Sequence, residues 1–283
     1  MQVGQVFCYP VKSLGGFAVD QTYVGPLGPR HDRQWVVVDE HGMFVAQRAQ
    51  RGLGVAVRAM CRVRTGIDGD RLVLSAPDVE PLTVPVPGAE GPGVEVTIWG
   101  DTAAGVDQGR EAAAWLTEVL GRHRPGVYRL VRMPDAGTRR TPQDDARVGY
   151  ADGYPLLVAT QASLDDLNAR IAQRRSAAGE PPVGTLGWDR FRPNLVVTGA
   201  PPYAEDGWAA LQAGQVRLAG RTLCKRCPIP STDQDTGLLG QEPLRTLATY
   251  RRPRDDRNAV VFARNFTHRS EGVVAVGDEV RVS

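Results

Sequence analysis

The sequence predicts a mixed α/β protein, rich in β-structure, made of two closely associated parts. Short segments rich in Val and aromatic residues, separated by Gly, Pro and Asp turns, fill residues 1–110. Helical periodicity begins only after residue 110 and then alternates with strands. A chain of 283 residues also buries enough surface for one or two domains without disulfides or structural metals. We therefore expect a β-barrel-like domain over residues 1–110 and a mixed domain over residues 111–283.

In the first part, short strands without helices between them are typical of a small barrel. Glu40-His41-Gly42 predicts a hairpin turn between two of these strands, and Asp78–Gly93, with several Pro and Gly residues, predicts a loop or an irregular edge. The predicted strands are Val3–Cys8, Phe17–Val24, Gln34–Asp39, Met43–Ala46, Val55–Val63, Arg71–Ser75 and Val94–Trp99.

The second part alternates helices and strands. Arg110–Leu120 has apolar residues at helical spacing and Gly121 after its end, which predicts a helix. Ser163 is expected to cap a second helix over Leu164–Arg175, and Glu242–Tyr250 predicts a third. The predicted strands are Val127–Val131, Leu156–Ala159, Asn194–Thr198, Val216–Leu218, Ala259–Phe262 and Val273–Val282.

Composition excludes several classes of protein. Lys and Arg number 34 against 32 Asp and Glu, and this near balance argues against a protein that coats nucleic acid. No apolar run approaches the ~18–20 residues of a membrane-spanning helix, and the N-terminus does not resemble a signal peptide. Four cysteines are too few for a disulfide scaffold. We expect a cytoplasmic protein with free thiols, no membrane contact and no nucleic-acid partner.

Cys224-Lys225-Arg226-Cys227 has three competing interpretations. It resembles half of a structural zinc site, but the sequence has no second CxxC and no histidine pair at ligand spacing. It also resembles a redox dithiol, but Pro230 would disrupt the helix that such a pair begins. In the third interpretation, one thiolate binds a soft or high-valent metal, with Lys225 and Arg226 lowering the thiol pKa and meeting an anion.

Cations and polar turns also stand beside several predicted strands. Each has an ordinary alternative: a solvated lysine, a salt-bridged turn, or a turn with no further role. Arg192 and Asn194 are two residues apart, so they share one face of an extended segment and could meet a phosphate together. The segments are Pro10-Val11-Lys12-Ser13, Arg30-His31-Asp32-Arg33, Arg190-Phe191-Arg192-Pro193-Asn194 and Asp152-Gly153-Tyr154-Pro155.

Taken together and in order, these segments resemble a known family over nearly the whole chain, from Val6 to Val282. The sequence is similar to MOSC proteins with an N-terminal β-barrel, a group that includes the mitochondrial amidoxime-reducing component and its bacterial relatives. The matching pieces are PVKS, DRQW, GYPLL followed by SLDDLN, FRPNLVVTG, AEDGW, CKRC, STDQDTG, EPLRTLATYR and VGDEVRV. The resemblance implies that the second part is a MOSC β-barrel domain with a few helices.

The resemblance also implies a molybdenum cofactor, in which molybdenum is held by the dithiolene of a phosphorylated pterin and by one protein cysteine. By match to the family motif, that cysteine is Cys227. The same match makes Lys12, Ser13 and Arg33 the holders of the pterin phosphate. Asp152 is a candidate for proton transfer, with a turn cap as its alternative. The remaining cofactor-lining residues implied are Asp152, Gly153, Tyr154, Arg192, Asn194, Lys225 and Arg226.

The implied reaction is two-electron reduction of an N-hydroxylated or N-oxide small molecule at molybdenum. Membrane-anchored members carry an N-terminal targeting segment, and some bacterial members carry a C-terminal iron–sulfur domain, whereas this sequence starts at its first strand and ends at Ser283. We therefore expect electrons from a separate protein: a ferredoxin, a flavodoxin, or a cytochrome b5-like protein with a reductase. The rival hypothesis is a carrier of molybdenum cofactor or sulfur that uses Cys227.

Overall fold

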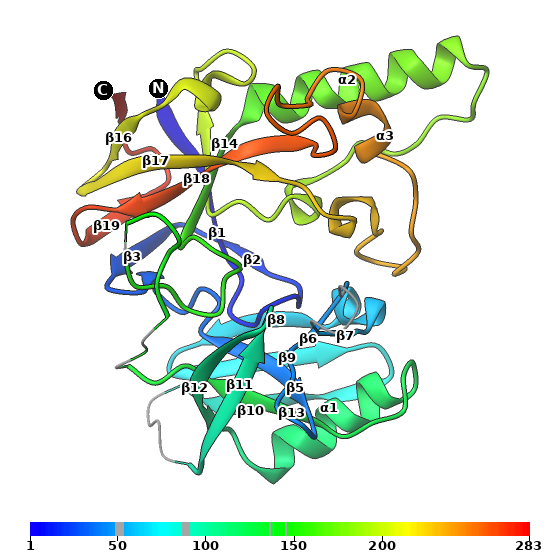
Figure 1. Ribbon diagram of the computed structural model, residues 1–283, viewed down its shortest axis with the longest axis vertical. Coiled ribbons are helices and arrows are strands. Elements are labelled where there is room, and N and C mark those ends of the chain that lie inside the picture. The colour runs from blue at the N-terminus through cyan, green and yellow to red at the C-terminus, as the bar shows by residue number, and fades with distance from the viewer. Residues whose placement is uncertain (49–53, 87–90, 136, 138, 145) are drawn as a thin grey trace.

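The computed structural model describes residues 1–48, 54–86, 91–135, 137, 139–144 and 146–283. Two β-rich halves lie one on the other, with helix α1 (Arg110–Gly121) in one half and helices α2 (Gln161–Ala177) and α3 (Leu244–Leu247) in the other (Figure 1). Within the described chain, no helix has the length and apolar character needed to cross a membrane. The architecture confirms the predicted β-rich α/β fold.

One half is an eight-stranded sheet that curls until its two edges approach each other. Gln2 bridges Glu279, and the Val3 amide donates to the carbonyl of Asp278 at 2.8 Å, so the first strand meets the end of the chain. The interior holds apolar side chains such as Leu218 and Phe266. In sheet order the strands are β2 (Phe17–Val19), β1 (Gln2–Cys8), β15 (Leu195–Thr198), β14 (Leu156–Thr160), β18 (Val261–His268), β17 (Val216–Lys225), β16 (Ala210–Ala213) and β20 (Val280–Val282).

The other half contains two small sheets, a separate two-stranded pair and one α-helix. Trp115 and Leu116 of α1 pack on the same core as Trp35 and Leu74, so the helix closes this half from outside. The larger sheet orders β11 (Gly93–Ile98), β12 (Asp101–Asp107), β13 (Tyr128–Arg132) and β5 (Trp35–Asp39). The smaller sheet orders β10 (Val79–Pro85), β9 (Arg71–Ala76) and β8 (Arg64–Asp68), and β6 (Val45–Ala46) pairs with β7 (Val55–Ala56).

The two halves exchange segments of chain. Strands β1 and β2 from the N-terminus belong to the eight-stranded sheet, and β3 (Gln21–Gly25) and β4 (Gly28–Pro29) form a sheet with β19 (Gly272–Ala275). Conversely, α1 and β13, which come later in the chain, pack on the core of the half formed by strands β5 to β12. The division predicted between residues 110 and 111 therefore falls at the start of a helix that packs with the residues before it.

Two predictions of local structure in the first half were wrong. Val55–Val63 forms only the short β7, followed by a 3-10 helix, η1 (Arg58–Arg62), because its buried residues, Val57, Met60, Cys61 and Val63, do not alternate. The segment Asp78–Gly93 contains strand β10, in which Leu82 and Val84 are buried on one face. Its prolines are tolerated because β10 is an edge strand, and residues 87–90 lie outside the described chain.

Several further boundaries differ from expectation, and the strands predicted at Val216–Leu218 and Ala259–Phe262 extend to Lys225 and His268. The predicted strand Phe17–Val24 breaks at Asp20 into β2 and β3. Helix α2 is capped by Thr160, whose hydroxyl accepts from the Ser163 amide, because the Ser163 side chain instead donates to buried Glu205. Helix α3 is only four residues long. Strands β4, β8, β12 and β16 were not predicted.

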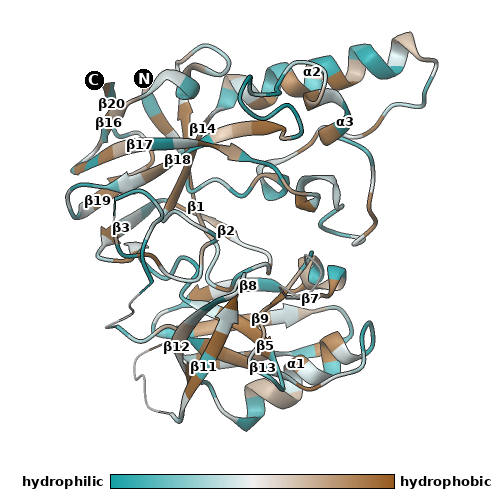
Figure 2. Ribbon diagram, viewed as in Figure 1, coloured by the Kyte–Doolittle hydropathy of each residue, from teal (hydrophilic) through white to brown (hydrophobic). Residues whose placement is uncertain are grey.

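Hydrophobic residues concentrate on the strands of both halves, while hydrophilic residues line much of α2 and the connections (Figure 2). One connection is fastened to the large sheet by Asp144. This carboxylate accepts from Arg221 at 2.5 Å and from Thr267 at 2.7 Å, and it pairs with Arg269 at 3.1 Å. Burial opposes its ionisation, but the hydroxyl donors Thr141 and Thr267 and the charge of Arg221 prevail and lower the pKa of Asp144 to about 2.

We expect Asp144→Asn to destabilise the protein near neutral pH and to matter less in acid. The folded pKa lies below the unfolded value, so the ionised carboxylate contributes stability above about pH 4, and this contribution disappears as the pH falls toward 2. The shift corresponds to about 2 kcal/mol of unfolding free energy. Urea unfolding of wild type and variant at pH 7 and near pH 3 measures it. An equal difference at both pH values would contradict this assignment.

Candidate cofactor site

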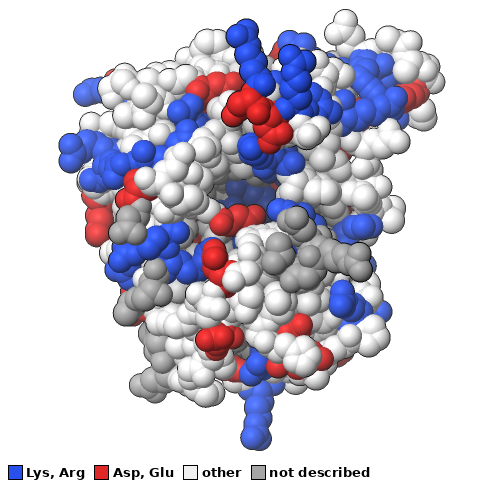
Figure 3. Space-filling model, viewed as in Figure 1, with Lys and Arg blue, Asp and Glu red and all other residues white. Residues whose placement is uncertain are grey.

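A cleft of about 180 Å³ opens between the two halves. Figure 3 shows a hollow in the middle of this face with Lys and Arg atoms deep inside it. Its walls come from segments far apart in the sequence. The lining residues are Lys12, Ser13, Arg33, Arg48, Ala151, Asp152, Gly153, Tyr154, Leu157, Phe191, Arg192, Asn194, Cys224, Lys225, Arg226, Cys227, Ile229 and Asn265.

All eleven residues that the sequence analysis singled out for the site line this one cleft. Lys12 and Ser13 follow β1, Arg33 precedes β5, and Arg192 lies shortly before β15. The segments that carry Asp152 and Cys227 precede β14 and follow β17. Lys12, Arg33 and Arg192 therefore lie in one cleft, and their roles toward a phosphate remain predictions.

Lys12 is buried, and its ammonium group is held by two oxygens. It donates to the carbonyl of Tyr150 at 2.9 Å and forms an ion pair with Asp152, which also accepts from Trp99 Nε1 at 2.9 Å. Desolvation opposes the charge of Asp152, but Lys12 and these hydrogen bonds hold the pKa of that carboxyl well below its usual range. Asp152 is thus ionised at neutral pH, which suits an ion-pair partner of Lys12 better than a proton donor.

Arg33 is fixed by a buried carboxylate. Its Nη1 donates to Asp32 Oδ1 and Oδ2 at 2.8 and 2.7 Å, its Nη2 donates to the carbonyl of Arg192 at 3.1 Å, and its guanidinium lies 4.4 Å from the ring centre of Tyr9. Burial opposes the charge of Arg33, but Asp32 outweighs it and raises the pKa of Arg33. These contacts fix the Arg33 guanidinium at the cleft wall.

Arg192 is a half-buried cation with less compensation. Its guanidinium lies 4.3 Å from the ring centre of Tyr9, and Nη1 donates to the carbonyl of Leu14 at 2.5 Å. Within the described chain no carboxylate forms an ion pair with it. Burial, and then the like charge of Arg33, lower the pKa of Arg192 to about 10. An anion at this place would stabilise the guanidinium.

The backbone at this site is unusual. Ser13, Arg33 and Arg192 have φ values of 68°, 47° and 60°, in the left-handed region that residues other than glycine rarely adopt. All three line the cleft. Such strain persists where surrounding contacts over-determine the backbone, and it concentrates at functional sites.

Asn194 has a different role from the one its residue type suggested. Its Oδ1 accepts from the Leu157 amide at 3.1 Å and from Arg33 at 3.4 Å, while Nδ2 donates to the carbonyl of Phe7 at 3.4 Å. The amide is 2% exposed and joins three segments of the wall. It therefore positions Arg33, and its hydrogen-bonding groups are already engaged by protein.

Both cysteines of the CxxC motif line the cleft as half-buried free thiols. Arg226 was expected to support Cys227, but its Nη1 donates to Cys224 Sγ at 3.1 Å and its Nη2 to the carbonyl of Phe191 at 3.0 Å. The reason is local: Arg226 packs over Phe191, which turns the guanidinium toward Cys224. Lys225 lies at the rim, 62% exposed and paired with Asp256 at 2.8 Å.

Sequence reasoning missed Arg48, Asn265 and the apolar wall formed by Leu157, Phe191 and Ile229. Arg48 lies 4.4 Å from the ring centre of Trp99, and its Nε is buried without a hydrogen-bond partner. Asn265 faces Leu157 across the β14–β18 pairing. A basic residue after strand β6 was a usable signal, whereas nothing local distinguishes Asn265.

The donor set fits an anionic ligand that carries a soft metal. Six Lys and Arg residues line the cleft against one carboxylate, Asp152. The Nε atoms of Arg48 and Arg226 are buried without partners, and Arg192 lacks a counter-ion among the described residues. Across the described chain, no three His, Cys, Asp or Glu side chains gather to hold a metal by themselves. A metal here would need ligands from a cofactor, with a cysteine as the protein donor.

Fold and site together define a MOSC protein: residues 1–123 match the MOSC N-terminal beta barrel domain, and residues 145–281 match the MOSC domain. The chain belongs to the family of the mitochondrial amidoxime-reducing components. It is 33% identical to component 1 of Mus musculus over 98% of this chain and 81% of that protein. It is 32% identical to Homo sapiens component 1 (98% and 82%) and 32% identical to Homo sapiens component 2 (88% and 72%).

We expect Arg192→Met to weaken anion binding in the cleft by about tenfold or more, since a charged hydrogen bond contributes roughly 1.5–3 kcal/mol. Calorimetric titration of the cofactor-free protein with inorganic phosphate measures the affinity. Arg71→Met is the matched control, because Arg71 is exposed at the start of β9. Equal phosphate affinity in wild type and Arg192→Met would contradict the anion site.

Proposed function

We propose that this protein is a molybdenum-cofactor-dependent reductase of N-hydroxylated or N-oxide small molecules. The observation that carries the proposal is the convergence of Lys12, Arg33 and Arg192 with Cys227 in one cleft. Relatives over nearly the full chain are named for amidoxime reduction, which supports the same class of substrate. Two electrons and two protons convert an N–OH group to N–H and water.

Each part of the cleft has its own task in this proposal. A bound molybdenum pterin would supply the oxygen-accepting redox chemistry, and Cys227 would provide its soft protein ligand. Lys12, Arg33 and Arg192 bind the phosphate group. Because protein contacts already hold these side chains in place, they need not rearrange when the anion binds. Leu157, Phe191 and Ile229 give the cleft an apolar wall.

Asp152 acts in this proposal as a partner of Lys12. Burial lowers the pKa of Lys12, and the Asp152 carboxylate, which remains ionised across the neutral range, offsets part of this effect through the ion pair. Protons for the reaction therefore come from solvent. A turn role, the alternative considered for Asp152, is compatible with its place before β14.

Electrons come from a separate redox protein in this proposal, since the cleft offers one cofactor site. The donor is a small iron–sulfur, flavin or haem protein, and the location proposed for the reaction is the cytoplasm, where the four free cysteines stay reduced.

Metal and pterin analysis of protein from a molybdenum-replete host, followed by turnover, tests the function. We expect about one molybdenum per chain, little zinc, and reduction of benzamidoxime with a chemical electron donor. Stoichiometric zinc without pterin would exclude the proposal. A full molybdenum load without turnover would instead support the carrier hypothesis.

The two cysteines should respond differently to substitution. We expect Cys227→Ser to abolish benzamidoxime reduction, because a hard hydroxyl replaces the soft thiolate. Cys224→Ser is the matched control: it should keep much of the activity and lose some stability, since Cys224 packs at the edge of an apolar cluster and accepts from Arg226. Both variants are assayed at matched molybdenum content. Complete loss in both would favour a dithiol pair, and full activity in Cys227→Ser would refute the mechanism.

A further inference from the structure

The motif Ser231-Thr232-Asp233-Gln234-Asp235-Thr236-Gly237 begins four residues after Cys227, yet none of its residues lines the cleft. Pro228 and a short 3-10 helix, η4 (Ile229–Ser231), lead from Cys227 into a tight hairpin over residues 232–239. The Asp233 amide donates to the carbonyl of Leu238 at 2.8 Å, and the Gly237 amide donates to the carbonyl of Asp233 at 2.8 Å. The hairpin is thus a compact continuation of the cysteine segment.

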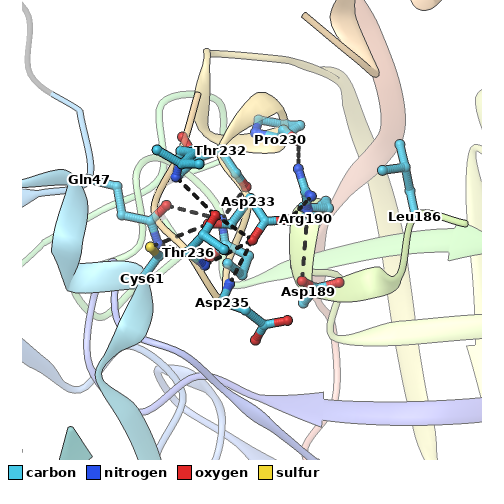
Figure 4. Close-up of polar contacts among 12 residues, drawn as sticks. Gln47, Cys61, Leu186, Asp189, Arg190, Pro230, Thr232, Asp233, Asp235 and Thr236 are labelled. Carbon is cyan, nitrogen blue, oxygen red and sulfur yellow. Dashed lines mark hydrogen bonds and ion pairs between the residues drawn. The ribbon is translucent and has the colours of Figure 1, made fainter. Parts of the chain in front are cut away.

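The carboxylate of Asp233 fixes the shape of this hairpin and its place (Figure 4). Oδ1 accepts from the amide and the hydroxyl of Thr236 at 2.9 and 2.8 Å. Oδ2 accepts from Arg190 at 2.7 Å, and Arg190 also donates to the carbonyl of Pro230 at 3.2 Å. Arg190 lies two residues before Arg192, so the hairpin is tied to a second wall of the cleft.

Gln234 carries the contact across to the other half. It is 2% exposed and pairs with the 4% exposed Gln47 through two amide contacts, of 3.1 and 3.3 Å. Gln234 Nε2 also donates to the carbonyl of Thr232 at 2.9 Å, and Gln47 Nε2 donates to the carbonyl of Ser13 at 2.8 Å. A continuous chain of hydrogen bonds therefore runs from the hairpin to Ser13, which lines the cleft with a left-handed backbone.

Two weaker contacts accompany this pair. Cys61 Sγ lies 3.6 Å from the carbonyl of Asp233, and Arg64 Nη2 lies 3.4 Å from the carbonyl of Gln234. Arg64 also forms an exposed ion pair with Asp235. Of these contacts, the buried Gln47–Gln234 pair should contribute most to stability. Removing one partner leaves the other amide buried without a hydrogen-bond partner.

We propose that Gln234 is a positioning residue, which seats the segment bearing Cys227 against the Ser13 wall through Gln47. We call this Gln47–Gln234 amide pair, with its hydrogen bond to the Ser13 carbonyl, the clasp. Arg48, the residue after Gln47, lines the cleft, so the clasp also positions one of the cations of the cleft. Gln234 is not among the residues that line the cleft, so it acts on the site through other residues. The identity of the cleft's ligand rests on the proposed function, but the clasp itself does not.

Hydrogen exchange by mass spectrometry on the purified, cofactor-free protein tests the clasp directly. In Gln234→Ala we expect exchange to rise roughly tenfold in peptides covering both 226–240 and 10–16, since the amide pair links them. Gln241→Ala, an exposed glutamine just beyond the same hairpin, is the matched control and should leave both peptides unchanged. Gln47→Ala should reproduce the effect, and the double variant should add little to either single change.

Retention of molybdenum pterin after dilution distinguishes a role of Gln234 in positioning the cleft from a general contribution to protein stability. We expect roughly tenfold faster loss from Gln234→Ala than from Ile171→Val, a core variant on α2 that lowers stability away from the clasp. Faster exchange confined to 226–240, or equal cofactor loss in Ile171→Val at a similar unfolding midpoint, would overturn the proposal. If wild type binds no pterin, the proposed function fails, while the exchange experiment still decides the clasp.

Discussion

Two half-buried guanidinium groups, those of Arg33 and Arg192, lie within 4.4 Å of the ring centre of the same tyrosine, Tyr9, and most of the cleft depends on this arrangement. Like charges so close together need compensation in a poorly hydrated place. Asp32 supplies it for Arg33, and its Oδ1 also accepts from the Tyr9 amide at 2.9 Å. Arg192 contacts the Tyr9 ring and the Leu14 carbonyl, which are uncharged, so an anionic ligand would compensate its charge.

This arrangement explains why the cleft lies between the halves. Tyr9 follows β1 and Arg33 precedes β5, so both lie where the chain runs between the halves. Arg192 and Asn194 precede β15 of the eight-stranded sheet. Strands β1 and β15 are antiparallel neighbours, and the Phe7 amide donates to the carbonyl of Asn194 at 2.9 Å, which brings the loops together. The exchange of the first strands into the second half is therefore what assembles the site, and a simple junction of two independent domains would separate its members.

Most residues of this site could be predicted from the sequence, but the hydrogen bonds among them could not. Lys12, Arg33, Arg192 and Cys227 could be singled out because the segments that carry them resemble, in order, the motifs of a known family. The engagement of Asn194 by the Leu157 amide and Arg33 could not be predicted, since it depends on strand register. The same holds for Arg226, which contacts Cys224 because of its packing on Phe191.

For the fold, periodic patterns were reliable and edge features were not. The apolar stripe of α1 gave its bounds to within one residue, because its buried face packs directly on a core. Strand β10 was missed because Pro81 and Pro85 resemble loop residues, and only its place at a sheet edge makes them acceptable. The cap of α2 moved to Thr160 because Ser163 is used by buried Glu205, a partner 42 residues away.

Left-handed backbone at Ser13, Arg33 and Arg192 and an uncompensated Arg192 both lower the stability of the ligand-free protein. Natural chains keep such local conflicts where a function needs them and offset them elsewhere. Here the offsets are visible: Asp32 holds Arg33, Asp152 holds Lys12, and Gln47 holds the Ser13 carbonyl. An anion that satisfies Arg192 completes the set, so ligand binding and stability of the folded cleft are coupled by mass action. Binding of the ligand therefore adds to the stability of the folded cleft.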